Sequence, residues 1–339
     1  MQNLAMKKLQ FSLIFFSLLG AAVTQAQVTT TPVAFVSTSV TANVGGSGTD
    51  LTYSPALNGT PAFQGTIATI PSSSSLQISG SPGWTANQYA NSYYVLIASG
   101  NLQGLWAQIS GNTTDTLSLT FFVGNLGSVA GSQVAVGDSV IIYPFWTLGT
   151  LVPDGPAPNG TVALLYDRSQ SGINKSASSI YTMYSGFGWY SGSTNGNGQI
   201  IYPDESLVIR VPAGQTLNLS VTGSVPMNKI STLLQNISAG QDQDIRITTG
   251  CPVPVGLGSF LNNGTPSGGD VVLIFDDTAQ GINKSASVIG TYYAGFGWYS
   301  GSTDLTNYQI QPTQGIVYRK AGANSSTNIT NTFKPAYQP

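Results

Sequence analysis

Residues 186–194 read Gly-Phe-Gly-Trp-Tyr-Ser-Gly-Ser-Thr, and the same nine residues stand again at 295–303. Upstream of each block, the sequence Gly-Ile-Asn-Lys-Ser-Ala-Ser occupies residues 172–178 and again 281–287. Both pairs have the same separation along the chain, 281 − 172 = 109 residues. The sequence therefore predicts a structural unit that is duplicated in tandem.

The duplicated stretch consists of short β-rich runs separated by turn-forming residues. Residues 162–166 are an apolar run, residues 176–184 are rich in β-branched and aromatic side chains, and residues 186–188 reverse the chain into a run led by Trp189. Such runs, bounded by Gly, Pro, Asn and Ser, are typical of β-sandwiches and small barrels. We therefore expect an all-β protein, with an N-terminal small β-barrel or sandwich followed by two tandem homologous β-sandwich-like units.

One segment has a different periodicity. Ile230, Leu233, Leu234 and Ile237 are spaced so that they would share one face of a helix. We expect a short helix over residues 230–239.

The positions of the repeats and of the Pro-rich stretch around Pro156 divide the chain into six expected segments. In chain order these are a signal peptide at 1–26, an N-terminal β domain at 28–147, a Pro-rich linker at 148–159, β repeat unit 1 at 160–255, β repeat unit 2 at 256–330 and a loose C-terminal tail at 331–339.

The signal peptide is predicted from its charge and length. Lys7 and Lys8 precede an apolar stretch, residues 11–22, which is too short for a comfortable membrane span. Small residues at 24–26 match a cleavage site, and no later stretch is apolar for long enough to cross a bilayer. We expect a secreted protein, extracellular or in the cell envelope, with no membrane span after signal cleavage.

The composition excludes several classes of function. Charged residues make up 7% of the chain, against about 25% in ordinary globular proteins, and Glu205 is the only Glu. His is absent, which removes the commonest general base and metal ligand and every Ser-His or Cys-His nucleophile. We expect no metal, no cofactor and, without a basic patch, no nucleic-acid partner. Cys251 is the only Cys and is expected to be an inert thiol.

The chain resembles a family of uncharacterised secreted bacterial β-rich proteins, over about residues 60 to 320. The matching elements are Trp-Thr-Leu-Gly-Thr at 146–150, the two Gly-Ile-Asn-Lys-Ser-Ala-Ser blocks, Thr-Gly-Ser-Val-Pro-Met-Asn-Lys at 222–229 and Pro-Val-Pro-Val at 252–255. The resemblance implies export and β architecture, and it carries no established activity. Such proteins often have basic residues after the hairpin Trp, whereas Tyr190 and Tyr299 follow it here.

The repeated hairpins are the candidate binding residues. Trp189 and Tyr190, with Trp298 and Tyr299 in the second copy, could form two platforms on which sugar rings stack. The alternative is that each Trp fills the core of its unit while the neighbouring Tyr points outward. We favour the core, and expect both Trp residues to be buried in equivalent places.

A second set of retained residues is expected to form the framework of each repeat. These residues are Asp167, Asn174 and Lys175 in the first copy and Asp276, Asn283 and Lys284 in the second. Each Asn can hold a turn through its side chain, and each Lys can pair with the Asp of its copy. An internal Lys–Asn isopeptide crosslink, with the Asp as proton shuttle, is a less favoured alternative that needs a buried, neutral Lys.

Acid–base hydrolysis requires two carboxylates at a fixed separation. The close pairs are Asp276 with Asp277, and Asp242 with Asp244. Neighbouring residues of a strand point to opposite faces, and Arg168 takes the place of Asp277 in the first copy. We interpret these carboxylates as solvated loop residues and expect no enzyme.

Three functions follow, in decreasing order of preference. The first is a secreted, non-catalytic structural protein of the cell surface or matrix that can self-associate, because its sheet edges carry few charged residues. The second is a carbohydrate-binding protein that uses the paired Trp-Tyr hairpins, with a cell-surface polysaccharide as partner. The third is an Asp-dependent hydrolase.

Overall fold

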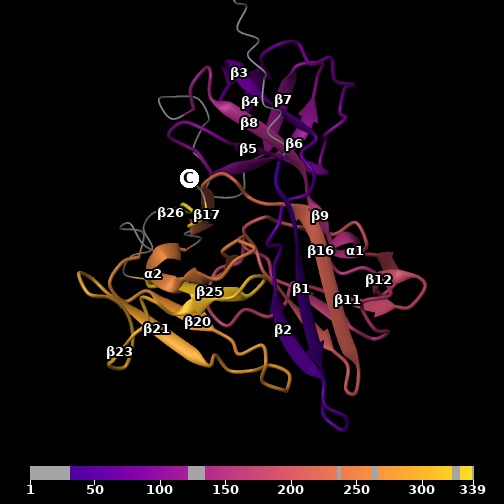
Figure 1. Cartoon of the computed structure of the whole chain (residues 1–339), viewed down its shortest axis with the longest axis vertical. Helices are drawn as coiled ribbons and strands as arrows, with labels where there is room; N and C mark the ends of the chain where they lie inside the picture. The colour runs from indigo at the N-terminus through magenta and orange to yellow at the C-terminus, as the bar shows by residue number, and fades with distance from the viewer. Residues whose placement is uncertain (1–30, 121–133, 235–237, 262–265, 323–328, 338–339) are drawn as a thin grey trace, which may run out of the picture. The chain divides into compact units, whose positions relative to one another are not determined.

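The computed structural model is an all-β structure, as the sequence predicts, and the two helices among its described residues, α1 (Leu148–Leu151) and α2 (Leu257–Phe260), have four residues each (Figure 1). The structure describes residues 31–120, 134–234, 238–261, 266–322 and 329–337. The expected signal peptide lies outside these residues. Within them, no helix has the length and apolar character needed to cross a membrane.

A closed antiparallel barrel is the first of three β modules. The sequence predicts a small barrel or a sandwich here, and the structure has the barrel, with strand order β3-β4-β7-β6-β5-β8. Apolar side chains such as Ile67, Val95, Ile109 and Ile142 fill its interior. Its strands are β3 (Phe63–Ser72), β4 (Ser75–Ile78), β5 (Tyr93–Ile97), β6 (Trp106–Asn112), β7 (Thr116–Thr120) and β8 (Ser139–Pro144).

The first repeat is built on a six-stranded antiparallel sheet, the first sheet, with strand order β13-β12-β11-β10-β15-β2. Five of its strands come from the repeated stretch, whereas β2 comes from before the barrel. The strands are β2 (Thr49–Tyr53), β10 (Val162–Leu165), β11 (Ser179–Tyr184), β12 (Gly188–Ser191), β13 (Thr194–Asn195) and β15 (Leu207–Val211).

The second repeat has an equivalent sheet, the second sheet, with strand order β23-β22-β21-β20-β25-β18. Each strand from β20 to β25 in it matches a strand of the first sheet, and β18 takes the place of β2. The strands are β18 (Gln243–Thr248), β20 (Val271–Ile274), β21 (Val288–Tyr293), β22 (Gly297–Ser300), β23 (Thr303–Asp304) and β25 (Gly315–Lys320).

Each repeat is completed by two smaller two-stranded sheets. In the first repeat β1 (Val33–Thr41) pairs with β16 (Thr216–Ser224), and β9 (Trp146–Thr147) pairs with β14 (Ile200–Ile201). In the second repeat β17 (Ile230–Leu234) pairs with β26 (Ile329–Phe333), and β19 (Val255–Gly256) pairs with β24 (Gln309–Ile310). The duplication therefore extends beyond the stretch that is visible in the sequence.

The strand pairing places the barrel inside the first repeat. Strands β1 and β2 precede the barrel, and their partners β16 and β15 follow it. Likewise β17 and β18 pair with β26 and β25, so the second repeat begins near residue 230. The pairings cross the boundaries expected at residues 147, 160 and 255. Local sequence patterns cannot place these boundaries, because they do not reveal partners as far apart as Ser37 and Ser220.

Three local expectations also differ from the structure. The segment expected to be a linker, 148–159, contains α1, and Leu148, Leu151 and Val152 are fully buried. The C-terminal segment expected to be loose, 331–339, begins inside β26, and Phe333 is buried. The helix predicted over 230–239 is wrong, because Ile230–Leu234 forms strand β17, whose pairing with β26 prevails over the local helical spacing; residues 235–237 lie outside the described part.

Candidate functional site

The two repeated Trp residues lie in the cores of their repeats. Trp189 is 0% exposed and Trp298 is 1% exposed, so the prediction that both are buried is confirmed. The indole of Trp189 donates to the carbonyl oxygen of Val152 at 2.7 Å, and that of Trp298 donates to the equivalent carbonyl of Leu261 at 3.3 Å. A buried indole has no face open to a sugar ring, so the structure does not support the stacking role considered for the two Trp residues.

The retained Lys residues fix the loop that follows the first strand of each repeat. The Lys175 ammonium group donates to the carbonyl oxygens of Asp167 and Gln170, and Lys284 makes the same two contacts in the second copy. Each Lys thus binds the backbone of its Asp, not the carboxylate as expected. The Asp167 carboxylate instead accepts from the backbone and the hydroxyl of Ser169.

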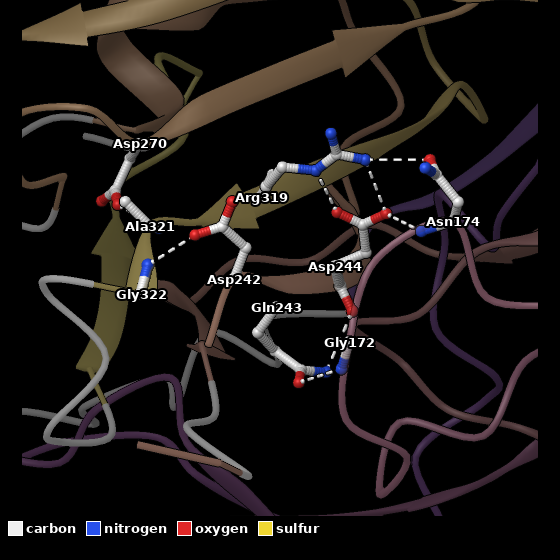
Figure 2. Close-up of polar contacts among 9 residues, drawn as sticks. All are labelled: Gly172, Asn174, Asp242, Gln243, Asp244, Asp270, Arg319, Ala321 and Gly322. Atoms are coloured by element: carbon white, nitrogen blue, oxygen red, sulfur yellow. Dashed lines mark hydrogen bonds and ion pairs between the residues drawn. The ribbon is translucent and has the colours of Figure 1, made fainter. Parts of the chain in front are cut away.

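The retained Asn residues connect one repeat to the other. Asn174 adopts a left-handed backbone conformation with φ 50°, which Asn tolerates. Its backbone N–H donates to Asp244 of the second sheet at 2.7 Å, and its side-chain oxygen accepts from Arg319 at 3.0 Å. Arg319 also forms a two-bond ion pair with Asp244, as Figure 2 shows. We call this set the Asn174 contact.

The second copy makes the same contact in the opposite direction. The backbone N–H of Asn283, with φ 52°, donates to Asp50 of the first sheet, and its side-chain oxygen accepts from Arg210. Arg210 forms a two-bond ion pair with Asp50. We call this the Asn283 contact. The loop of each repeat therefore binds the sheet of the other, which gives a structural reason for the retained block.

These contacts also correct two sequence interpretations. Asp244 is buried and paired, not a solvated loop residue, whereas Asp242 is exposed and accepts from the backbone of Gly322 (Figure 2). Asp277 accepts from the backbone and hydroxyl of Thr52, and burial raises the pKa of its carboxyl. The isopeptide alternative is not supported either, because the Lys175 ammonium lies on backbone carbonyls and the Asn174 amide binds Arg319.

The outward face of each hairpin carries exposed apolar side chains that are identical in the two copies. Phe187 and Phe296 at the hairpin tips are 73% and 78% exposed. The rings of Tyr184 and Tyr190 lie 6.2 Å apart, as do their counterparts Tyr293 and Tyr299. We define the outer hairpin faces as Ile180, Tyr184, Phe187 and Tyr190 in the first repeat and Ile289, Tyr293, Phe296 and Tyr299 in the second.

Two inward positions near the same hairpins have changed between the copies, although the buried Trp189 and Trp298 have not. In the first repeat the ring of Tyr181 fills the space above Gly196, where a Cβ atom would come within 2.2 Å of it. In the second repeat the sizes are exchanged: Leu305 fills the space above Gly290, where a Cβ atom would come within 2.8 Å of the Leu305 side chain. Core packing needs only volume and tolerates such exchanges. Packing therefore explains the variable core but not the constant outer hairpin faces.

A pocket of about 310 Å³ lies in the first repeat beside Glu205. We call it the Glu205 pocket; Tyr166, Asp167, Ser169, Ser178 and Tyr202 are among the residues that line it. The charged residues that line it are notable in a chain with 7% charged residues. Sequence reasoning missed this site, although the only Glu of the chain could have indicated it.

In the second repeat, the side chain at the equivalent position is held by hydrogen bonds. Gln314 stands in the place of Glu205, and its amide donates to the Phe275 carbonyl and accepts from the Gln311 backbone N–H, both at 3.0 Å. In the described part of the chain, no side chain donates a hydrogen bond to the Glu205 carboxylate. Burial, partly offset by Arg168, raises the pKa of Glu205 to about 7. Glu205 thus lacks side-chain hydrogen-bond donors at a position where Gln314 of the second repeat makes two hydrogen bonds.

The Glu205→Gln variant is expected to remove a pH dependence of stability. The folded protein keeps the Glu205 proton to a pH of about 7, whereas the unfolded chain releases it near the ordinary value of 4.5. Wild-type stability therefore falls as pH rises through this window, by on the order of 2–3 kcal/mol. Denaturant unfolding should show equal stabilities of the wild type and the Gln variant near pH 4.5 and a more stable Gln variant near pH 8. Asp304→Asn, at an exposed carboxylate, is the control, and a Gln variant that follows the wild-type pH profile would contradict the assignment.

Cys251 is inert in the structure. Cys251 is buried, and burial raises the pKa of its thiol to about 12, which fits the expected unreactive role. Among the described residues, no group of three or more acidic, Cys or His side chains is placed to hold a metal ion.

Comparisons with protein-family models, curated proteins and solved structures find no match to the chain.

Proposed function

We propose that the protein is a secreted, non-catalytic structural protein of the cell surface or matrix that self-associates through its outer hairpin faces. The observation that carries the proposal is a contrast between the two copies: the exposed apolar residues of the outer hairpin faces are identical, whereas the packed residues Tyr181 and Gly196 are replaced by Gly290 and Leu305. Exposed apolar patches mark interaction sites. Packing within the repeat does not require the residues of the outer hairpin faces, so their identity in both copies favours a role in binding.

A second copy of the chain is the partner that the surroundings of these faces favour. The outward side of each sheet already contacts the other repeat at one edge, where Arg210 binds Asn283 and Arg319 binds Asn174. The outer hairpin face continues this surface. Tyr190 and Arg210 lie on the same side of the sheet, at the two ends of one row of paired residues that runs through Thr182 and Val162. A surface that binds a repeat on one side is suited to bind a repeat of another chain on the other.

The association is tested by light scattering coupled to size-exclusion chromatography on the mature chain. We expect oligomers whose fraction rises with concentration, and we expect the Phe187→Ser, Phe296→Ser double variant to be monomeric with an unchanged circular dichroism spectrum. Val136→Ser, at an exposed apolar residue of the barrel that is 66% exposed, is the matched control. A strictly monomeric wild type at high concentration would refute the proposal.

Carbohydrate binding at the hairpins is a second candidate, favoured by the chemistry around Tyr190. Its hydroxyl lies 3.4 Å from the Asn195 amide, and the neighbouring Tyr184 ring meets it edge to face. An aromatic ring with an amide beside it suits sugar binding. Tyr299 has Asp304 in place of the amide, and two aromatic sites would bind a polymer with avidity. A polysaccharide pull-down should then be lost in the Tyr190→Ala, Tyr299→Ala double variant, and binding that persists would eliminate these sites.

A further inference from the structure

At the Glu205 pocket the first repeat lacks contacts that the second repeat makes at the equivalent position. The two copies share their fold, so the second repeat serves as an internal reference for what the framework needs. There, Gln314 binds two backbone groups. In the first repeat, the corresponding carboxylate is left at a pocket of about 310 Å³. The framework does not require this arrangement, which points to a ligand.

The other charged groups near the pocket are already paired or bound. Arg168 forms a two-bond ion pair with Asp204 at 2.9 and 3.0 Å. The guanidinium of Arg246, from β18, lies 3.7 Å above the ring of Tyr166. Lys175 lies near Asp167. With Glu205 ionised, the cations Arg168, Lys175 and Arg246 balance the anions Asp167, Asp204 and Glu205.

This balance decides the chemistry of the ligand. A ligand with a net charge of either sign would have no unpaired counter-charge to meet, whereas an isolated buried charge is strongly unfavourable. The carboxylate of Glu205 needs hydroxyl donors. The lining hydroxyl of Ser179 can both donate and accept, whereas those of Ser169 and Ser178 donate to Asp167 and to the Leu165 carbonyl and can still accept. The ring of Tyr202 adds an aromatic wall. Neutral molecules rich in hydroxyl groups match all of these features.

We propose that the Glu205 pocket binds a neutral saccharide, with the ionised carboxylate of Glu205 accepting hydrogen bonds from its hydroxyl groups. The volume suits one or two sugar rings. The site is separate from the outer hairpin faces, and it does not depend on self-association. Because the ionised carboxylate is the acceptor, affinity increases with pH. Arg168, Asp204, Asp167, Lys175, Tyr202 and Arg246 are the charged or titratable groups that face Glu205 and shape this dependence.

The test is binding of neutral and charged sugars to the full mature chain, measured by ligand-observed NMR and calorimetry. The probes are glucose, galactose, mannose, glucosamine and glucuronate. We expect at least one neutral hexose to bind more tightly than both charged sugars, with a Kd that falls about tenfold between pH 5.5 and pH 8. If no neutral hexose binds at about 50 mM, or if a charged sugar binds best, the proposal is overturned.

Variants separate this pocket from the hairpins. Glu205→Gln should weaken hexose binding at least about tenfold at pH 8 and abolish its pH dependence, and it should fold because Gln occupies the equivalent position of the second repeat. Asp304→Asn and the Tyr190→Ala, Tyr299→Ala double variant should bind the hexose as the wild type does. Binding lost in the Tyr variant but kept in Glu205→Gln would assign the sugar to the hairpins and refute the pocket.

Discussion

The Trp189→Ala variant is expected to lose about 3–5 kcal/mol of unfolding free energy, measured by denaturant unfolding with far-ultraviolet circular dichroism. The indole is fully buried in the first repeat, and its N–H satisfies the carbonyl of Val152 at the end of α1. Truncation leaves a large cavity and an unsatisfied buried carbonyl. The Trp298→Ala variant should show a loss of similar size, because the second repeat makes the same contacts.

Phe187→Ser is the matched control for this prediction. Phe187 is an aromatic residue of the same hairpin that is 73% exposed, so its replacement should change stability by no more than about 0.5 kcal/mol. A loss below about 1 kcal/mol in both Trp variants would show that the hairpins do not depend on their indoles, and would reopen the question of what Trp189 and Trp298 do.

The Asp244→Ala variant is expected to lose about 2–4 kcal/mol and to loosen the Asn174 contact. The substitution removes both bonds to Arg319, whose side chain is 21% exposed, and leaves the Asn174 backbone N–H without its acceptor. Hydrogen exchange should become faster at Asn174 and in the loop around it. The mechanism is the loss of one partner from a largely buried ion pair, which leaves an uncompensated charge.

Asp242→Ala provides a matched control two residues away. Asp242 is exposed and binds only the backbone of Gly322 among the contacts drawn in Figure 2, so its loss should be below about 1 kcal/mol. Equal effects of the two Asp substitutions, or unchanged exchange at Asn174, would contradict the assigned role of the Asn174 contact.

The all-β class could be predicted because period-two runs and turn residues are local signals. The burial of Trp189 and Trp298 could be predicted for a similar reason, since a retained aromatic residue on a strand is usually packed. The partner strands of β1 and β2 could not, because they lie on the far side of the barrel in the sequence. The helical spacing at Ile230 was misleading because tertiary pairing prevails over local preference.

The candidate site was predicted less completely than the fold. Retention of Asn174 and Asn283 indicated a constraint, but the residues they bind, Asp244 and Asp50, lie outside the repeated stretch. The Glu205 pocket could not be predicted from the retained residues, because these mark only what the two copies share. Positions at which otherwise similar copies differ in charge, such as Glu205 and Gln314, carry the complementary information.

The insertion of the barrel between β2 and β9 has a consequence for the order of folding. All barrel strands lie between residues 63 and 144, so the barrel can form as soon as that segment is available to fold. Strands β1 and β2 emerge earlier but must wait for β15 and β16, and Ser37 meets a partner 183 residues later. Contacts of such long sequence separation form slowly, and unpaired strand edges invite association with other chains. If the chain folds as it emerges, β1 and β2 are therefore among the last strands to be paired.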